Sequence, residues 1–100
     1  MNLPLIITPE AEADLAQAKA WYDQQRSGLG DELLLCVEEV LEQIGRSPES
    51  PQIVYAGVRR VVVRRFPFGV FYRIEPDQIA VIAIYDCRRN PRTWQRRVIK

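Results

Sequence analysis

The chain has 100 residues, of which 47% are hydrophobic and 27% charged, with 14 Lys and Arg, 13 Asp and Glu, and no histidine. This content is too apolar for a disordered chain and predicts a single domain over residues 1–100. The lack of histidine excludes His-based acid–base catalysis, Ser-His-Asp triads and His-ligated zinc. The two cysteines, Cys36 and Cys87, are too few for a disulfide scaffold, and we expect reduced thiols, no metal site and no cofactor.

Hydropathy gives no sign of a membrane segment. The longest apolar run, Ile79–Tyr85, has seven residues, whereas a membrane helix needs about 20. The first residues lack the basic region of a secretory signal. We therefore expect a cytoplasmic protein without membrane contact.

The near-neutral total hides a divided charge. Residues 1–50 hold three basic and ten acidic residues, a net charge of −7, and residues 51–100 hold eleven basic and three acidic residues, a net charge of +8. Such asymmetry favours a nucleic-acid or acidic-protein partner for the basic half, but pairing of the two halves within the molecule explains it equally well. Ten of the eleven C-terminal cations are arginine, which binds phosphate and carboxylate and does not release its proton at neutral pH.

The N-terminal half predicts a strand and two helices. The segment Leu3–Ile7 is apolar and reads as a short strand. Thr8 is a typical N-cap, and apolar residues at helical spacing predict a helix from there to about Gln25. After a glycine-containing break, a second helix is predicted from Asp31, with Gly45 as its C-terminal cap. Two helices joined by so short a connection form a helical hairpin.

The C-terminal half changes to strand periodicity. Strands are predicted at Arg59–Phe66, Val70–Glu75 and Gln78–Asp86, and the short turns between them favour antiparallel pairing. The run Ile79–Ile84 does not alternate, so we expect a central strand covered on both faces. The order of elements predicts an α+β fold with the helices on one face of a sheet.

Alternation along the first long strand predicts where its arginines point. Arg60 and Arg64 share one face and would stand on the open side of the sheet, about 13 Å apart, while Val61 and Val63 contact the helices. A second basic cluster, residues 88–97, follows the last strand. Simpler explanations stay open, because edge-strand charges prevent unwanted pairing and the aromatic residues in these segments can serve packing alone. The closing pair of arginines in that cluster is also typical of a solvated end.

Several segments occur in an order that is typical of one family. They are Thr8–Ala11 with Asp14, Leu15, Trp21 and Tyr22; Gly28–Gly30; Pro48 and Pro51; Gly57–Arg60; Arg64–Arg73; and Arg88–Pro91 with Trp94. With these segments the chain resembles the RelE/ParE superfamily of type II toxin–antitoxin toxins, also called plasmid stabilisation proteins.

The resemblance implies a β-α-α-β-β-β toxin with its helical hairpin packed on one face of a small, mainly antiparallel sheet. It also implies a cognate antitoxin that wraps the toxin in a hetero-oligomer. RelE-like members cleave mRNA on the ribosome, and ParE-like members poison DNA gyrase. The resemblance matches Arg64, and Arg88 or Arg89, to basic positions of the family. Together with the basic segments described above, this gives the expected target-binding residues as Arg60, Arg64, Arg65, Arg88, Arg89, Arg92 and Trp94. For a nuclease, the candidate catalytic residues are Arg64, Tyr72, Arg88 and Arg89.

Departures from the ribonuclease pattern favour the gyrase poison. This chain has arginines where ribonuclease members carry lysines, Asp86 where many relatives carry histidine, and no tyrosine after Tyr85. A ParE-like growth inhibitor without enzymatic activity is therefore preferred, with a RelE-like ribosome-dependent mRNA endonuclease as the alternative. A non-toxic partner-binding module on the same fold is a further alternative.

Overall fold

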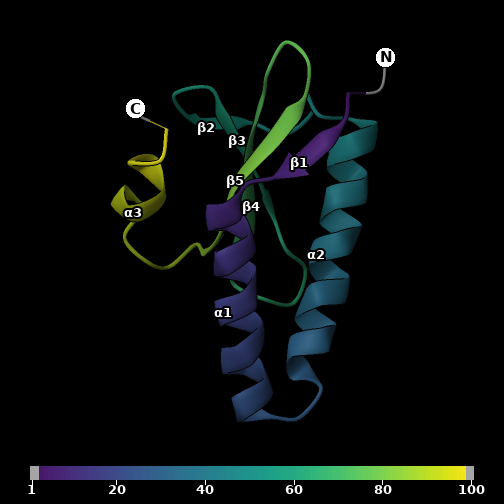
Figure 1. The fold of residues 1–100 in the computed structure, drawn as a ribbon, viewed down its shortest axis with the longest axis vertical. Helices are drawn as coiled ribbons and strands as arrows, with labels where there is room; N and C mark the ends of the chain where they lie inside the picture. Colours follow the sequence, from purple (N-terminus) through teal and green to yellow (C-terminus); the bar gives the residue numbers. More distant parts are fainter. Residues whose placement is uncertain (1–2, 99–100) are drawn as a thin grey trace.

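The chain folds into a twisted five-stranded sheet with a helical hairpin on one face (Figure 1). The computed structural model describes residues 3–98. The strands are β1 (Leu5–Ile7), β2 (Ile53–Tyr55), β3 (Val58–Val62), β4 (Phe68–Ile74) and β5 (Ile79–Asp86). The helices are α1 (Pro9–Gln25), α2 (Leu29–Arg46) and α3 (Arg92–Gln95). This arrangement confirms the predicted α+β class and the helical hairpin, and adds the short elements β2 and α3.

The sheet is antiparallel except at one edge. Its strand order is β1-β5-β4-β3-β2, and β1 runs parallel to β5 while the other neighbours are antiparallel. A bulge lies between β4 and β5, where Phe71 pairs with Ala83 but Tyr72 pairs with Val81. β1 covers only Ile79–Val81, so the rest of β5 has no neighbouring strand on that side among the described residues.

Local chemistry sets the helix boundaries. The Thr8 hydroxyl accepts a hydrogen bond from the Ala11 backbone and so caps α1, as predicted. Helix α2 begins at Leu29, two residues before the predicted start, because Gly28 adopts a left-handed conformation (φ 89°) that reverses the chain at once. The predicted cap Gly45 lies inside α2, which continues to Arg46.

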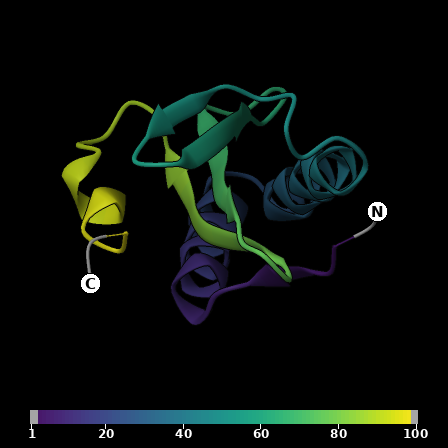
Figure 2. The ribbon, with the colours of Figure 1, turned by 90° about the horizontal axis from the view of Figure 1, so that it is seen from above.

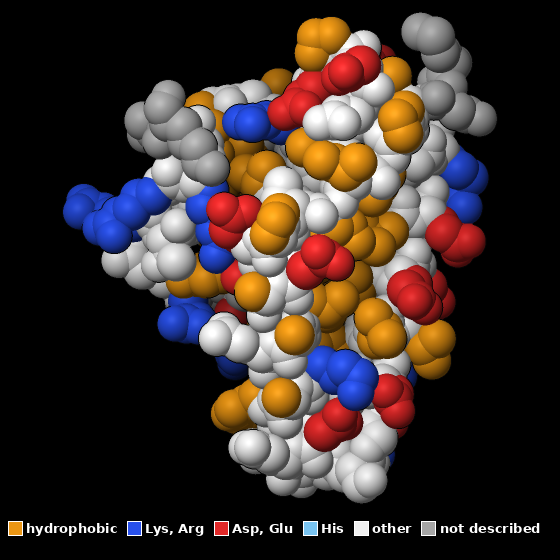
Figure 3. Space-filling view, viewed as in Figure 1, with side chains coloured by type: hydrophobic (Ala, Val, Ile, Leu, Met, Phe, Trp, Pro, Cys, Tyr) orange, Lys and Arg blue, Asp and Glu red, His pale blue; other side chains and the backbone are white. Residues whose placement is uncertain are grey.

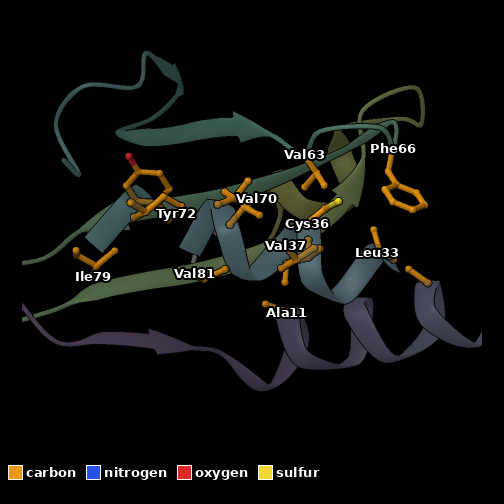
Figure 4. Close-up of a cluster of buried hydrophobic side chains, with 14 residues drawn as sticks. Ala11, Leu33, Cys36, Val37, Val63, Phe66, Val70, Tyr72, Ile79 and Val81 are labelled. Atoms are coloured by element: carbon orange, nitrogen blue, oxygen red, sulfur yellow. The ribbon is translucent and has the colours of Figure 1, made fainter. Parts of the chain in front are cut away.

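The main core lies between the hairpin and the sheet (Figures 2 and 4). Residues spaced at three and four along α2, among them Leu33, Val37 and Ile44, face β-strand residues such as Val70 and Val81. Burial of these side chains is the main force that holds the hairpin on the sheet.

A second, smaller core lies on the opposite face of the sheet. The Trp94 side chain of α3 is 4% exposed and packs with its ring centroid 4.4 Å from that of Phe71 and 5.8 Å from that of Tyr55. With Ala80 and Ile82 beneath it, this cluster covers the second face of β5. The expectation that the Ile79–Ile84 strand is covered on both faces is therefore confirmed.

The arginine-bearing strand is shorter than predicted. β3 ends at Val62, and the Val63 amide donates to the Phe68 carbonyl (2.7 Å) to close the turn into β4. Arg65, in that turn, has a positive φ of 73°. Val61 and Val63 do contact the helix-side core. Within the described residues, no helix is long and apolar enough to cross a membrane.

Candidate functional site

Arg60 and Arg89 are far apart in sequence but lie on the same face of the sheet, opposite the hairpin. Arg60 extends over Gly69, where a Cβ would come within 3.1 Å of the arginine Cγ and Cδ atoms. Gly69 is the register partner of Tyr85, and the Arg89 guanidinium carbon lies 5.4 Å from the centroid of the Tyr85 ring. The two side chains therefore rest on neighbouring positions of β4 and β5. The glycine makes this possible, because any side chain at position 69 would displace the Arg60 stem.

Among residues 51–98, four exposed arginines form no ion pair with a carboxylate of residues 3–98. They are Arg60, Arg89, Arg92 and Arg96. In the space-filling view, basic side chains gather on the α3 side of the molecule, and acidic side chains lie over α1 and α2 (Figure 3). We call Arg60, Arg89 and Arg92 the arginine surface, since these three were also predicted from the sequence.

Other predicted arginines are paired with acidic groups. Arg64 does not stand on the open face beside Arg60, because β3 ends before it, and its guanidinium instead contacts Glu39 of α2 at 3.1 Å. Arg65 likewise contacts Glu32 of α2 at 2.9 Å. The divided charge of the chain is thus partly satisfied inside the molecule, which is the second explanation that the sequence left open.

Arg88 is neutralised by a residue of the strand that precedes it. Its Nε and Nη2 atoms donate to the two carboxylate oxygens of Asp86 at 3.1 and 2.8 Å. This hydrogen bonding holds the pKa of Asp86 below its usual value, so the carboxylate stays charged. The guanidinium of Arg88 is consequently less available to an anion than that of Arg89.

Two predicted aromatic site residues serve the cores instead. The Tyr72 side chain is fully buried, its hydroxyl donates to the Pro48 carbonyl at 2.6 Å, and burial raises the pKa of the phenol above its usual value. Trp94 is enclosed by Tyr55 and Phe71 and presents no ring face for stacking. Neither the catalytic expectation for Tyr72 nor the target-binding expectation for Trp94 fits this burial.

Arg97, which the sequence suggested was part of a solvated end, is a partly buried structural residue. Its guanidinium forms two hydrogen bonds with Asp14 of α1, at 2.7 and 3.0 Å, and donates to the Ile82 carbonyl at 3.0 Å. The Asp14 carboxylate also accepts from the Ile84 amide at 3.1 Å. The Asp14–Arg97 ion pair therefore takes up the Ile82 carbonyl and the Ile84 amide at the edge of β5, just beyond the end of β1. A neighbouring strand would otherwise hydrogen-bond to these two groups.

A groove of about 370 Å³ continues along this edge, between α1 and the end of β5. We call it the α1–β5 groove. Trp21 and Tyr22 of α1 line one wall, and Tyr85, Arg88 and Arg89 line the other. Trp21 is 56% exposed, so the α1 wall of the groove presents a large aromatic side chain to solvent.

The sequence did not assign Trp21 to a site. It did contain a signal, because Trp21 falls beside the apolar stripe of α1 that Ala18 and Tyr22 continue. A tryptophan next to such a stripe, and not within it, points to solvent or to a partner. No pattern in the sequence indicated the contact between Asp14 and Arg97, which are 83 residues apart.

The sequence matches a family model, and the fold matches a solved structure. A family model described as "ParE toxin of type II toxin-antitoxin system, parDE" matches residues 5–91. No curated protein sequence matches the chain. Among solved structures, a chain of the "Chromosomal ParDE TA system from P. aeruginosa" is similar with a TM-score of 0.66 at 22% identity, and the match covers 84% of this chain and 95% of that one. At this identity the structural match supports the fold alone.

Proposed function

Because the chain belongs to the ParE toxin family of type II toxin–antitoxin systems, we propose that it inhibits growth by binding DNA gyrase through the arginine surface. We further propose that a cognate antitoxin neutralises it and that it acts in the cytoplasm. The sequence features that favoured a binding toxin over a nuclease motivate the choice of gyrase.

The observation that carries the proposal is that the candidate bases near the unpaired arginines are engaged in other contacts or lie on the far side of the sheet. Arg60 and Arg89 offer exposed cations, but the Tyr72 hydroxyl is buried on the far side of the sheet. The Tyr85 hydroxyl, on the ring beneath Arg89, donates to the Asn90 carbonyl at 3.3 Å. Hydrogen bonds from Arg88 lower the pKa of Asp86 and so make its carboxylate a weaker base. A ribonuclease needs a group near its arginines that can take the proton of the 2′-hydroxyl. Cations that bind an acidic protein surface or phosphate need no such partner.

The test compares two kinds of damage after the toxin is induced. A gyrase poison causes double-strand breaks with covalently attached gyrase, and purified toxin with gyrase converts supercoiled DNA to the linear form. A ribosome-dependent nuclease causes codon-specific breaks in messages, which primer extension detects. Message breaks without gyrase-linked breaks would overturn the gyrase proposal in favour of the nuclease, and a lack of growth inhibition would favour the non-toxic module.

Variants locate the activity on the surface. We expect Arg60→Ala with Arg89→Ala to reduce gyrase-dependent DNA breakage by at least about tenfold, because two exposed, unpaired cations are lost. The matched control is Arg26→Ala, since Arg26 is an exposed arginine at the far end of the hairpin that is paired with Glu32. Equal loss in both would indicate a general effect on folding, and full activity of the double variant would refute the assignment of the arginine surface.

A further inference from the structure

The α1–β5 groove has a strand edge as its floor. Ile84 donates its amide to Asp14, which lies outside the sheet, so the Ile84 carbonyl points to the same side. Cys87 donates its amide to the Pro67 carbonyl on the β4 side, so by alternation the Asp86 amide points away from β4. Within residues 3–98, no strand pairs with β5 there. The Ile84 carbonyl, an acceptor, and the Asp86 amide, a donor two residues later, therefore both face the groove.

This spacing matches the bonding pattern of a parallel strand. In a parallel ladder, one residue donates its amide to the carbonyl before its register partner and accepts from the amide after it. The residue placed opposite Tyr85 would make both bonds, with Ile84 and with Asp86. β1 already runs parallel to β5 at Val81, so an added strand of that direction continues the same edge. Adding a strand to an exposed edge is a common mode of peptide recognition.

The walls of the groove determine which side chains such a strand would carry. Register partners point to the same face of a sheet, so the side chain opposite Tyr85 points toward Arg89, whose guanidinium lies over the Tyr85 ring. Arg89 forms no ion pair with a carboxylate of residues 3–98, and an acidic side chain complements it. The residues on either side point to the opposite face, where their register partners are Ile84 and Asp86, and Arg88 neutralises the Asp86 carboxylate. On the α1 wall, Tyr22 and the exposed Trp21 face the same space, and apolar side chains fit against them and Ile84.

We propose that the α1–β5 groove binds an extended segment of the cognate antitoxin, added to β5 as a parallel strand with an apolar–acidic–apolar sequence centred opposite Tyr85. This inference rests on the proposed neutralisation by an antitoxin and specifies where and how it occurs. The groove volume of about 370 Å³ lies within the ordinary range of ligand sites, roughly 300–1,000 Å³, which is sufficient for a few residues and not for a whole helix.

The direct test is hydrogen exchange at single backbone amides in the toxin alone and in complex. The probe is the purified product of the reading frame adjacent to this gene. We expect the Asp86 amide to exchange at least about tenfold more slowly in the complex, because it gains a strand hydrogen bond. The Ile84 amide, already bonded to Asp14, is the internal reference and should change little. An unchanged Asp86 amide would overturn strand addition.

Affinities of variants test the side-chain preferences. Trp21→Ala and Arg89→Glu should each weaken antitoxin binding by at least about tenfold, as expected for the central aromatic and arginine contacts of an interface. Leu35→Ala and Arg96→Glu are the matched controls, because both residues are exposed and lie outside the groove. They should change affinity by less than about threefold. If the two groove variants bind as tightly as the wild type, the proposed docking site is wrong.

The outcomes separate this inference from the gyrase proposal, which is tested without antitoxin. Binding of the adjacent gene product with no effect at Trp21, Asp86 or Arg89 overturns the groove and leaves the gyrase proposal intact. If the gyrase assay fails but the Asp86 amide is protected in the complex, the gyrase proposal is overturned and the groove is supported. If the adjacent gene product does not bind the wild-type toxin, both the groove and the neutralisation are refuted.

Discussion

Replacing Arg97 with alanine tests whether the Asp14–Arg97 ion pair holds α3 and α1 against the edge of β5. The change removes two hydrogen bonds to the carboxylate and one to the Ile82 carbonyl. The Asp14 carboxylate keeps its bond from the Ile84 amide but loses its neutralising partner. The energetic effect then depends on how far the pair is removed from water.

The structure gives that exposure. The side chains of Arg97 and Asp14 are only 20% and 13% exposed. Removing one partner of a fully buried pair costs about 3–5 kcal/mol, while an exposed pair contributes roughly 0–1 kcal/mol. With a carbonyl also left without its donor, we expect Arg97→Ala to lower the free energy of unfolding by about 2–4 kcal/mol. For a domain of this size, the melting temperature would fall by about 10–25 °C.

The assay is urea and thermal unfolding followed by circular dichroism and by tryptophan fluorescence. A double-mutant cycle with Asp14→Ala isolates the pair and should give a coupling energy of about 1–3 kcal/mol. Arg64→Ala is the matched control, because the Arg64–Glu39 pair has side chains 69% and 58% exposed, and its loss should change the free energy of unfolding by no more than about 1 kcal/mol. An Arg97→Ala effect as small as that of the control would refute the structural role of the pair.

Three further predictions concern other contacts. Thr8→Ala should lower the free energy of unfolding by about 1–2 kcal/mol, since it removes the cap of α1 and a 3.0 Å hydrogen bond to β5. Gly30→Ala should lower the free energy of unfolding by about 1–3 kcal/mol, because the new Cβ would lie 2.5 Å from a backbone oxygen of α1. Gly45→Ala is the contrasting variant: the space around Gly45 is open, so the free energy of unfolding should rise by about 0.5–1 kcal/mol in the same assay. Arg88 lowers the pKa of Asp86 in the folded state, so in acid the unfolded chain binds more protons than the folded chain. The Asp86–Arg88 contact therefore stabilises the folded state fully above the unfolded pKa of Asp, about 3.9. This contribution is lost as the pH falls through the pKa of Asp86 in the folded state. The stability difference between wild type and Asp86→Asn, measured as melting temperature against pH, should therefore shrink from pH 6 to pH 3, and a constant difference would contradict this pairing.

Much of the fold could be predicted from the sequence because its signals are local. The hydroxyl of Thr8 and the helical spacing of apolar residues placed α1 to within a residue, and the uninterrupted Ile79–Ile84 run predicted a strand covered on both faces. Such signals depend on neighbours a few residues away, which the backbone geometry of helices and strands brings together. The short element β2 carries too few residues to produce a detectable period.

Where the charged side chains go was decided by tertiary structure alone. Period-two spacing could count Arg60 and Arg64 as neighbours, but it could not show that β3 ends between them and that Arg64 turns to α2. The contact of Arg97 with Asp14 spans 83 residues, and the proximity of Arg60 to Arg89 depends on strand register. The sequence by itself therefore determined that the C-terminal half is rich in cations. Which cations stay unpaired follows from long-range packing, because an ion pair forms only where the completed fold brings a carboxylate within a few ångströms.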